Sequence, residues 1–198
     1  MKERTRCAWA GDDPAMVDYH DREWGRPQHD DRALFEFIVL EGAQAGLSWS
    51  TILHRRVGYR RAYRDFNPAK VARFGEREIA KLLADERIIR NRAKIVWSVR
   101  NAQAFLGVQR EHGSFDEYLW SFVGGKPVVN RPRSSADIPA RTELSDALSK
   151  DLRKRGFGFV GSTICYAFLQ ATGVVNDHAA SCFLAPPGKR RARGVSVR

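Results

Sequence analysis

The feature that most constrains the fold is an uncharged stretch of 21 residues, from Gly156 to Asn176. A stretch of this length is long enough to span a membrane as one helix. Four glycines, together with serine, threonine and glutamine side chains, interrupt it, and this content is too high for a segment in hydrocarbon. We therefore expect no membrane span but a helix buried in the protein core, preceded by a glycine-rich turn.

Apolar residues recur at helical spacing along most of the chain, and few stretches alternate as strands do. Between Leu34 and Leu40 they nearly encircle the helix axis, which predicts a second buried helix. Asp31, Ser48 and Ser145 are the expected N-caps. The predicted helices cover residues 32–45, 49–63, a short segment from 68, 76–84, 90–106 and a basic helix ending near 156. Residues 124–142 contain three prolines and predict a surface loop. The expected fold class is all-α, with two helical lobes and both chain ends in one of them.

Residues 156–161 (Gly-Phe-Gly-Phe-Val-Gly) have the glycine spacing of a dinucleotide-binding turn. That turn acts between a strand and a helix of a βαβ unit, where its glycines admit a pyrophosphate. Here the preceding residues 146–155 have a helical pattern, and no βαβ unit surrounds them. We therefore interpret the glycines as a tight joint between two helices and expect no nucleotide cofactor.

The chain is strongly basic, with 34 Lys and Arg against 23 Asp and Glu and a net charge of +11. Such an excess favours a polyanionic partner. The basic residues gather in residues 55–64, 87–110, 150–155 and 189–198, whereas the first 31 residues are net acidic. A single basic cluster is more often a solvated helix face. Three clusters in the folded part favour nucleic acid, because each neutralised phosphate releases counterions. We expect residues 185–198 to form a disordered basic tail.

Cysteine usage and the start of the chain bear on the compartment. The three cysteines, Cys7, Cys165 and Cys182, show no short-range pairing, so we expect no disulfide framework and a reducing environment. Residues 1–7 are basic, but no apolar segment follows them, and they do not resemble a secretory signal. These features predict a cytoplasmic protein.

Two histidine–cysteine pairs lie near opposite ends of the chain. His178 and Cys182 are four residues apart, which on a helix places both side chains on one face. Cys7 and His20 complete a Cys₂His₂ set, which suits tetrahedral zinc. Alternatively, the cysteines are small core residues and the histidines are satisfied locally. If the site exists, four protein ligands leave no position for water, and the metal would be a structural clamp between the chain ends.

Glu41 is a candidate buried acid. It follows Leu34, Phe37 and Ile38 at helical spacing, so its carboxyl group projects from an apolar face, which is unfavourable without a partner. One interpretation is a structural ion pair or hydrogen bond. Aromatic residues in the neighbouring segments favour a second one, a pocket that binds a flat cationic or electron-poor ring by stacking and cation–π attraction. These residues are Trp9, Tyr19, Trp24 and Trp49.

Four segments carry motifs that together resemble one family. They are Cys7-Ala8-Trp9, residues 19–25 (Tyr-His-Asp-Arg-Glu-Trp-Gly), residues 40–49 (Leu-Glu-Gly-Ala-Gln-Ala-Gly-Leu-Ser-Trp) and residues 176–182 (Asn-Asp-His-Ala-Ala-Ser-Cys). Over about residues 5–184 the chain resembles the bacterial 3-methyladenine DNA glycosylases of the constitutive type. The resemblance implies a helix-hairpin-helix superfamily fold, with one glycosylase domain in residues 1–184 and the hairpin around 76–106. It also implies a structural zinc ion bound by Cys7, His20, His178 and Cys182.

The resemblance further implies a pocket for adenine. Tyr19 and Glu41 would contact the edge of the base, Trp49 and Trp9 would form aromatic walls, and Trp24 would lie beside them.

The sequence departs from the family pattern in two places. The turn at residues 85–89 has no glycine, so we expect phosphate contacts from backbone amides and from Arg90, Arg92 and Lys94. Met16 replaces an aromatic residue often found three positions before Tyr19.

The implied activity is DNA base-excision repair, by hydrolysis of the N-glycosidic bond of 3-methyladenine in alkylated double-stranded DNA. The damaged base must be flipped out of the stack, and we expect Leu47, at the break in residues 46–48, to act as a wedge. Glu41 would favour the cationic base and an oxocarbenium-like transition state. No lysine is obviously placed to form a Schiff base, so an abasic site without strand cleavage is expected. Nothing in the sequence indicates an obligate dimer, and we expect a monomer.

Two alternatives remain from the residues alone. The protein could be a zinc-stabilised helical module that binds damaged DNA without cutting it. A zinc hydrolase is a third hypothesis, which the complete set of four ligands disfavours.

Overall fold

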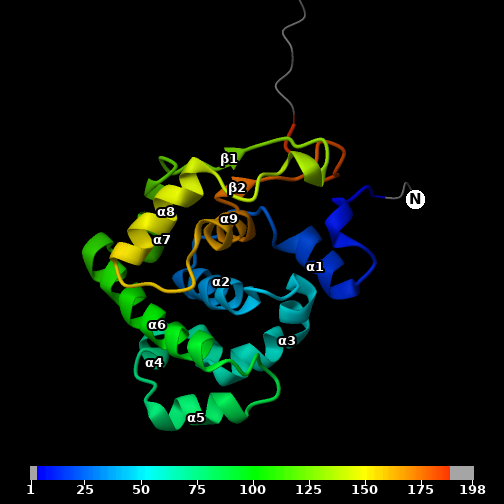
Figure 1. Cartoon of the computed structure of the whole chain (residues 1–198). Coiled ribbons are helices and arrows are strands. Elements are labelled where there is room, and N and C mark those ends of the chain that lie inside the picture. The colour runs from blue at the N-terminus through cyan, green and yellow to red at the C-terminus, as the bar shows by residue number, and fades with distance from the viewer. Residues whose placement is uncertain (1–3, 188–198) are drawn as a thin grey trace, which may run out of the picture.

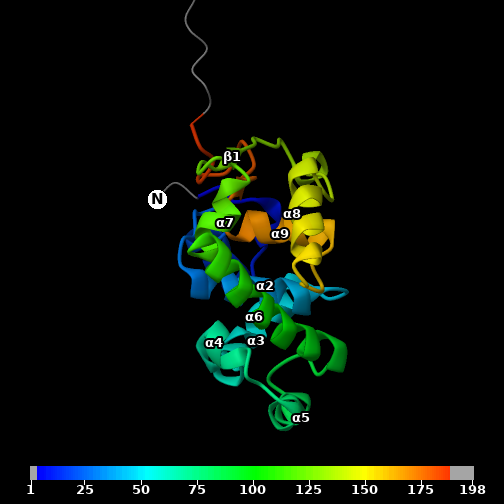
Figure 2. The ribbon, with the colours of Figure 1, turned by 90° about the vertical axis from the view of Figure 1, so that its left-hand side faces the viewer.

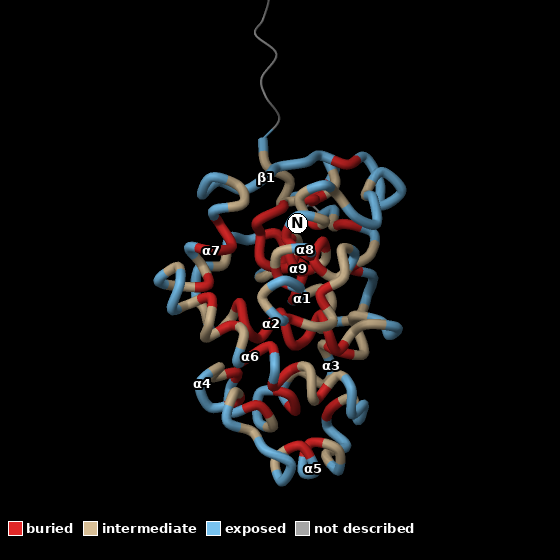
Figure 3. Tube along the Cα trace, turned by 60° about the vertical axis from the view of Figure 1, so that its left-hand side comes forward, coloured by how far each residue is buried: buried red, intermediate tan, exposed pale blue. Residues whose placement is uncertain are grey.

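Two buried helices lie at the centre of the computed structural model, which describes residues 4–187 (Figure 1). They are α2 (Asp31–Gln44) and α9 (Ser162–Ala171). Every residue of α2 from Leu34 to Ala43 is buried, as expected for a helix that is apolar on all sides. Figure 3 shows this buried centre with exposed segments around it. Glu41 therefore lies on the helix that the rest of the molecule covers.

One end of the molecule is built from α3 (Trp49–Ala62), α4 (Pro68–Val71), α5 (Glu76–Ala84) and α6 (Arg92–His112). α5 lies farthest from the centre, and the long α6 runs from this end toward α7 (Phe115–Ser121) (Figures 1 and 2). Side-chain caps begin three of these helices: Ser48 accepts a hydrogen bond from Thr51 N, Asn67 from Lys70 N and Asn91 from Lys94 N.

The opposite end contains α1 (Pro14–Arg22), α7 (Phe115–Ser121), α8 (Glu143–Lys154) and two short strands. The strands β1 (Val128–Val129) and β2 (Val175–Asn176) pair in parallel. Three 3₁₀ segments complete the elements of residues 4–187, at Ala8–Ala10, Arg64–Phe66 and Ser135–Asp137. Phe183 N donates to Thr5 O at 2.9 Å, so the two described ends of the chain meet here, as predicted.

The uncharged stretch forms α9 and the turns on both sides of it. The backbone of Gly158 is held by the Asn101 side chain, which accepts from Gly158 N at 2.9 Å and donates to Gly158 O at 3.0 Å. A Cβ at this position would lie 2.3 Å from the Trp97 ring, so only glycine fits. The glycines thus pack a turn against α6. No helix within residues 4–187 is long and apolar enough to cross a membrane.

The mainly helical fold agrees with the sequence prediction, whereas several helix ends differ. α2 begins at Asp31 and is capped by Asp30, because the side chain of Asp30 reaches Ala33 N. α8 is capped by Thr142 instead of Ser145, which forms the other half of a reciprocal capping box. α6 begins two residues later than predicted and continues to His112, and α1 and α7 were not predicted. Residues 188–198, most of the predicted tail, lie outside the described residues.

Candidate functional site

A cavity of about 360 Å³ opens beside the buried end of α2. Its lining comes from α1, α2, α3 and α9, from the segments that contain Trp9 and Trp24, and from the loop before α8. The lining residues are Trp9, Met16, Tyr19, Trp24, Glu41, Gln44, Trp49, Ser135, Ile138, Ala167 and Gln170. All five residues predicted to bind or act on a base therefore line one cavity. Its volume suits a small flat ligand.

The carboxyl group of Glu41 is the most unusual feature of this cavity. The residue is 3% exposed, and Oε2 is buried without a hydrogen-bond partner. Burial raises the pKa of Glu41 to about 8, because no cation among the described residues 4–187 offsets the loss of water. A buried polar atom without a partner is rare in proteins. An unpartnered acid that lines a cavity is therefore a candidate ligand-binding or catalytic group.

Aromatic rings form the walls around Glu41. Trp9 and Trp24 meet edge to face with centroids 4.9 Å apart, and the Tyr19 and Trp49 rings lie 5.3 Å apart. The indole Nε1 of Trp49 is also buried without an acceptor. Burial raises the pKa of Tyr19 well above its usual value, and the nearby Glu41 raises it further, so the phenol keeps its proton. The residues that line the cavity thus include aromatic rings and two buried polar atoms without a partner, Trp49 Nε1 and Glu41 Oε2.

The turn between α2 and α3 carries Leu47. Gly46 adopts φ +79°, a conformation that favours glycine, and Ser48 caps α3. Leu47 is 40% exposed, which makes it one of the few exposed large apolar side chains in residues 4–187. The turn therefore presents an apolar side chain to solvent one residue from the capping Ser48 and two from the cavity wall at Trp49.

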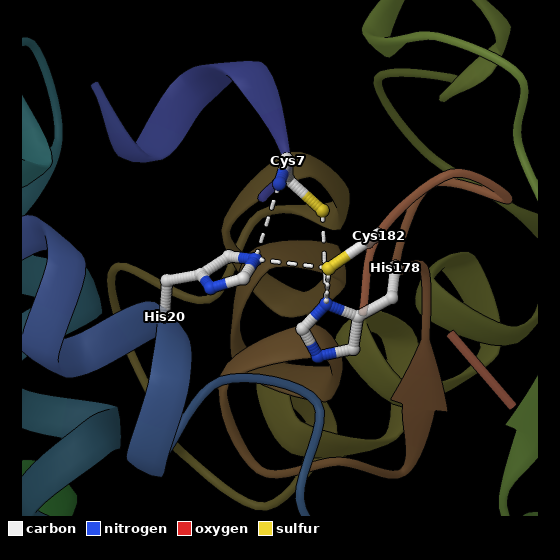
Figure 4. Close-up of side chains that lie close together, drawn as sticks. All are labelled: Cys7, His20, His178 and Cys182. Atoms are coloured by element: carbon white, nitrogen blue, oxygen red, sulfur yellow. Dashed lines mark hydrogen bonds between the residues drawn. The ribbon is translucent and has the colours of Figure 1, made fainter. Parts of the chain in front are cut away.

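The second cluster consists of Cys7, His20, His178 and Cys182, all buried (Figure 4). Their ligand atoms lie within 4.8 Å of one another. Cys182 Sγ is 3.4 Å from His20 Nε2 and 3.5 Å from His178 Nδ1, and Cys7 Sγ is 3.6 Å from His178 Nδ1. Ligands bound to tetrahedral zinc at their usual bond lengths are separated by about 3.3–3.8 Å. The four side chains therefore fit such an ion.

Outer hydrogen bonds orient both histidine rings of this cluster. His20 Nδ1 lies 2.8 Å from the Asp21 carboxylate, and His178 Nε2 lies 3.1 Å from the Trp24 carbonyl. Each oxygen is an acceptor, so these nitrogens carry the protons and the other ring nitrogens face the cluster as bases. Metal-binding histidines use this arrangement. Since Trp24 also lines the cavity, the cluster and the cavity share a wall.

Some site residues were not predicted as such. Gln44 lies three residues after Glu41, on the same face of α2, and this spacing was an available signal. Gln170 donates from Nε2 to Asp177 at 2.6 Å, and its place in the cavity depends on the packing of α9. Ile138 reaches the cavity from the proline-rich loop, for which the sequence has no signal. Met16 lines the cavity at the position where an aromatic residue was expected.

Parts of the basic clusters pair within the protein. Arg56 donates to Glu36 and Glu23, and Arg60 donates to Glu36. Lys94 Nζ donates to two backbone carbonyls at the end of α2, so two of its three N–H groups are used within the protein, and its expected phosphate contact stays a prediction. The arginine–glutamate pairs neutralise part of the basic cluster at residues 55–64, but they leave the net charge unchanged, because that sum already counts the paired acids.

The fold and the cavity define a class of protein: a helical protein with a cavity lined by aromatic side chains and an unpartnered acid, of a size that suits one flat ring. Comparison with known proteins gives the family. The methyladenine glycosylase family matches residues 9–185. DNA-3-methyladenine glycosylase 1 of Escherichia coli (strain K12) is 48% identical over 184 residues, which cover 93% of this chain and 98% of the relative.

Two further relatives agree. The DNA-3-methyladenine glycosylase of Haemophilus influenzae is 47% identical over 90% of this chain and 96% of its own length. The solved structure of 3-methyladenine DNA glycosylase I from Staphylococcus aureus, described for its recognition of 3-methyladenine, has a TM-score of 0.89 at 37% identity and covers 92% of this chain and 97% of its own. This chain belongs to the methyladenine glycosylase family, which confirms the resemblance in its motifs.

Proposed function

We propose that the protein acts in DNA base-excision repair and hydrolyses the N-glycosidic bond of 3-methyladenine in alkylated double-stranded DNA. The single observation that carries this proposal is the aromatic cavity with Glu41 buried and unpartnered among its lining residues. A purine methylated at N3 is cationic within DNA, and the cavity suits a flat cationic ring by stacking and by charge. Family membership supports the same activity.

The reaction needs little acid catalysis because the base leaves as a neutral molecule. Water attacks the sugar carbon, the bond to the base breaks, and its electron pair neutralises the methylated ring. The proton of the water passes to solvent, and an abasic site remains. Glu41 ionises beside the cation and stabilises the positive charge that moves to the sugar in the transition state. No lysine of the described residues 4–187 lines the cavity, so no Schiff base is proposed.

Five of the lining residues have distinct parts in holding the flipped base. Trp49 and Trp9 stack on its faces and Trp24 supports Trp9, with which it is in edge-to-face contact. Tyr19 and Glu41 hydrogen-bond to its edge, and the unpartnered Nε1 of Trp49 provides a further donor. The pocket thereby favours a base that fills these positions over water.

DNA binding uses two exposed parts of the molecule. Leu47 fills the space that the flipped base leaves, as apolar wedges do in other proteins that distort DNA. The turn at residues 85–91 between α5 and α6 acts as the hairpin of a helix-hairpin-helix motif and contacts phosphates through backbone amides, Arg90 and Arg92. Both arginine side chains are more than half exposed.

The Cys₂His₂ cluster holds a structural zinc ion in this proposal. Bound there, the ion would cross-link the two ends of the chain. Its four protein ligands would leave no coordination position open for water or substrate. Cys7 and His20 bring the amino-terminal segment, and His178 and Cys182 bring the carboxy-terminal one. This clamp completes a single domain over residues 1–184 that acts as a monomer.

The decisive experiment measures base release. The protein is incubated with methylated duplex DNA, and free 3-methyladenine is measured by mass spectrometry. We expect release of the base and an intact strand with an abasic site. Binding to methylated DNA without release would contradict the enzyme and support a damage-binding module.

A matched pair of variants connects the activity with the cavity. Glu41→Gln keeps the shape of the side chain but cannot ionise, so we expect it to lower the release rate by about 10²-fold or more with the fold intact. Glu143→Gln is the same chemical change on the exposed face of α8 and should release base at the parent rate. Equal rates for the parent and Glu41→Gln would remove Glu41 from the mechanism.

A further inference from the structure

Lys94 has an unusual position for a cation. It lies in the first turn of α6, where the helix dipole is unfavourable for positive charge. Its side chain is partly buried, and Nζ donates to Ala43 O at 2.7 Å and to Ala45 O at 2.6 Å. These short contacts direct the ammonium group to the end of another helix instead of solvent.

The two carbonyls belong to the end of α2. The last carbonyls of a helix have no partner within the helix, and they attract cations. Gln44 is the final residue of α2, so Ala43 and Ala45 flank the point where the chain leaves the helix. The side chain of Lys94 therefore caps α2 from outside and fixes the start of the turn that carries Leu47.

The residues on either side of this contact belong to the proposed DNA-binding parts. On one side, Asn91 caps α6 and directly follows Arg90 of the hairpin. On the other side, Ala45 lies two residues before Leu47 and four residues after Glu41. Lys94 is thus a direct side-chain link between the first turn of the second hairpin helix and the turn that presents the wedge.

We propose that Lys94 is a positioning residue that holds the Leu47 turn at a fixed spacing from the hairpin. DNA phosphates bound at the hairpin then determine where Leu47 enters the duplex and where the flipped base meets Glu41. This inference rests on the proposed function. It assigns Lys94 an action through Leu47 rather than contact with the substrate.

Salt dependence separates this role from a direct phosphate contact. A residue that binds a phosphate contributes about one to the slope of log affinity against log salt concentration. Lys94→Met keeps the aliphatic stem and removes the charge. We expect the salt slope of Lys94→Met on undamaged duplex to equal that of the parent. The salt slope of Arg90→Met, a change in the exposed hairpin, should be smaller than that of the parent by about one.

The functional readout is the single-turnover rate of base release. Without the Lys94 contacts the Leu47 turn is no longer held in place, so we expect Lys94→Met to release base more slowly by about tenfold or more. Its affinity for undamaged duplex should stay near that of the parent. Lys94→Arg, which can still donate to both carbonyls, should restore most of the rate. A purely structural defect would weaken binding and the reaction together and would lower the melting temperature.

Hydrogen exchange provides a readout that does not depend on activity. In Lys94→Met, the amides of residues 45–49 should exchange faster, whereas those of α9 should not change. A parent protein that releases no base would overturn the proposed function, yet exchange would still test the link. Three results for Lys94→Met would each overturn the positioning role. They are a salt slope smaller than that of the parent by about one, a rate of base release equal to that of the parent, and unchanged exchange of the amides of residues 45–49.

Discussion

Glu41 destabilises the folded protein when it ionises. Its pKa rises from an ordinary value of 4.5 to about 8 because the folded chain buries it without a cation. Since the folded-state pKa is the higher one, the favourable contribution of the neutral carboxyl is complete below pH 4.5. It is lost progressively as pH rises from there through about 8.

Glu41→Gln is therefore expected to raise stability at high pH. The amide stays neutral, so at pH 8.5 the variant should have a higher melting temperature than the parent. Its free energy of unfolding should be higher by an amount on the order of a few kcal/mol. The difference should shrink steadily and vanish below pH 4.5. Thermal unfolding between pH 4 and 9 measures it, and a difference that does not vary with pH would contradict the assigned burial effect.

At the scale of single residues, the sequence predicted what local spacing determines. Glu41 was recognisable because its apolar neighbours lie on the same face of one helix, and that helix is buried as expected. Gln170 and Ile138 were missed because their places in the cavity depend on how α9 and a distant loop pack. The occupied state of Lys94 depends equally on a contact between helices far apart in sequence.

At the scale of elements, a glycine determines how closely the hairpin approaches α3. A Cβ at Gly58 would lie 2.6 Å from both Cβ and the backbone oxygen of Arg87. Arg87 is in turn fixed to Asp85 through its backbone and guanidinium nitrogens. Tyr59 accepts a hydrogen bond from Ile89 N beside this contact. The hairpin that lacks its own glycine is thus placed by a glycine on the neighbouring helix.

We expect Gly58→Ala to displace the hairpin from α3. Alanine is favoured over glycine in a helix by about 0.5–1 kcal/mol, but the contact with backbone atoms should outweigh this gain. The variant should melt lower than the parent and bind duplex DNA more weakly. Calorimetry and fluorescence anisotropy measure the two effects.

Gly107→Ala is the matched control for this change. Gly107 also lies inside a helix, and its added Cβ would meet only the end of the Arg110 side chain at 3.8 Å. It should melt at or above the parent temperature and bind DNA normally. Equal behaviour of the two variants would show that the approach of Arg87 to Gly58 has no consequence.

Elements with local signals were predicted better than those without. The cap Ser48 and the bounds of α5 agree with the sequence prediction, because side chains within four residues determine them. α7 was not predicted, and its residues Phe115, Leu119 and Trp120 pack into the core that other helices form. Tertiary packing, which a local pattern does not contain, stabilises such short helices.

At the scale of the whole molecule, the Cys₂His₂ cluster joins the two ends of the chain. We expect one zinc ion per chain and a large fall in melting temperature when a strong chelator removes it. Cys182→Ser should lose the metal. Native mass spectrometry and thermal unfolding give the two measurements.

Cys165→Ser is the control for this prediction. Cys165 is also buried, but its Sγ donates to Val160 O and is not in the cluster, so the variant should keep its zinc. His178→Ala should lose stability together with activity. Loss of base release with an unchanged melting temperature in that variant would show a catalytic metal and contradict the structural role.

The meeting of the chain ends has a consequence for the order of folding. The contact between Cys7 and His178 closes a loop of 171 residues, and such distant contacts form late because loop closure opposes them. Trp24 lines the base cavity and its carbonyl holds His178. A ribosome must therefore release nearly the entire chain before the cavity can close. Nascent chains lacking residues 176–182 should carry most of their helices but no finished base pocket.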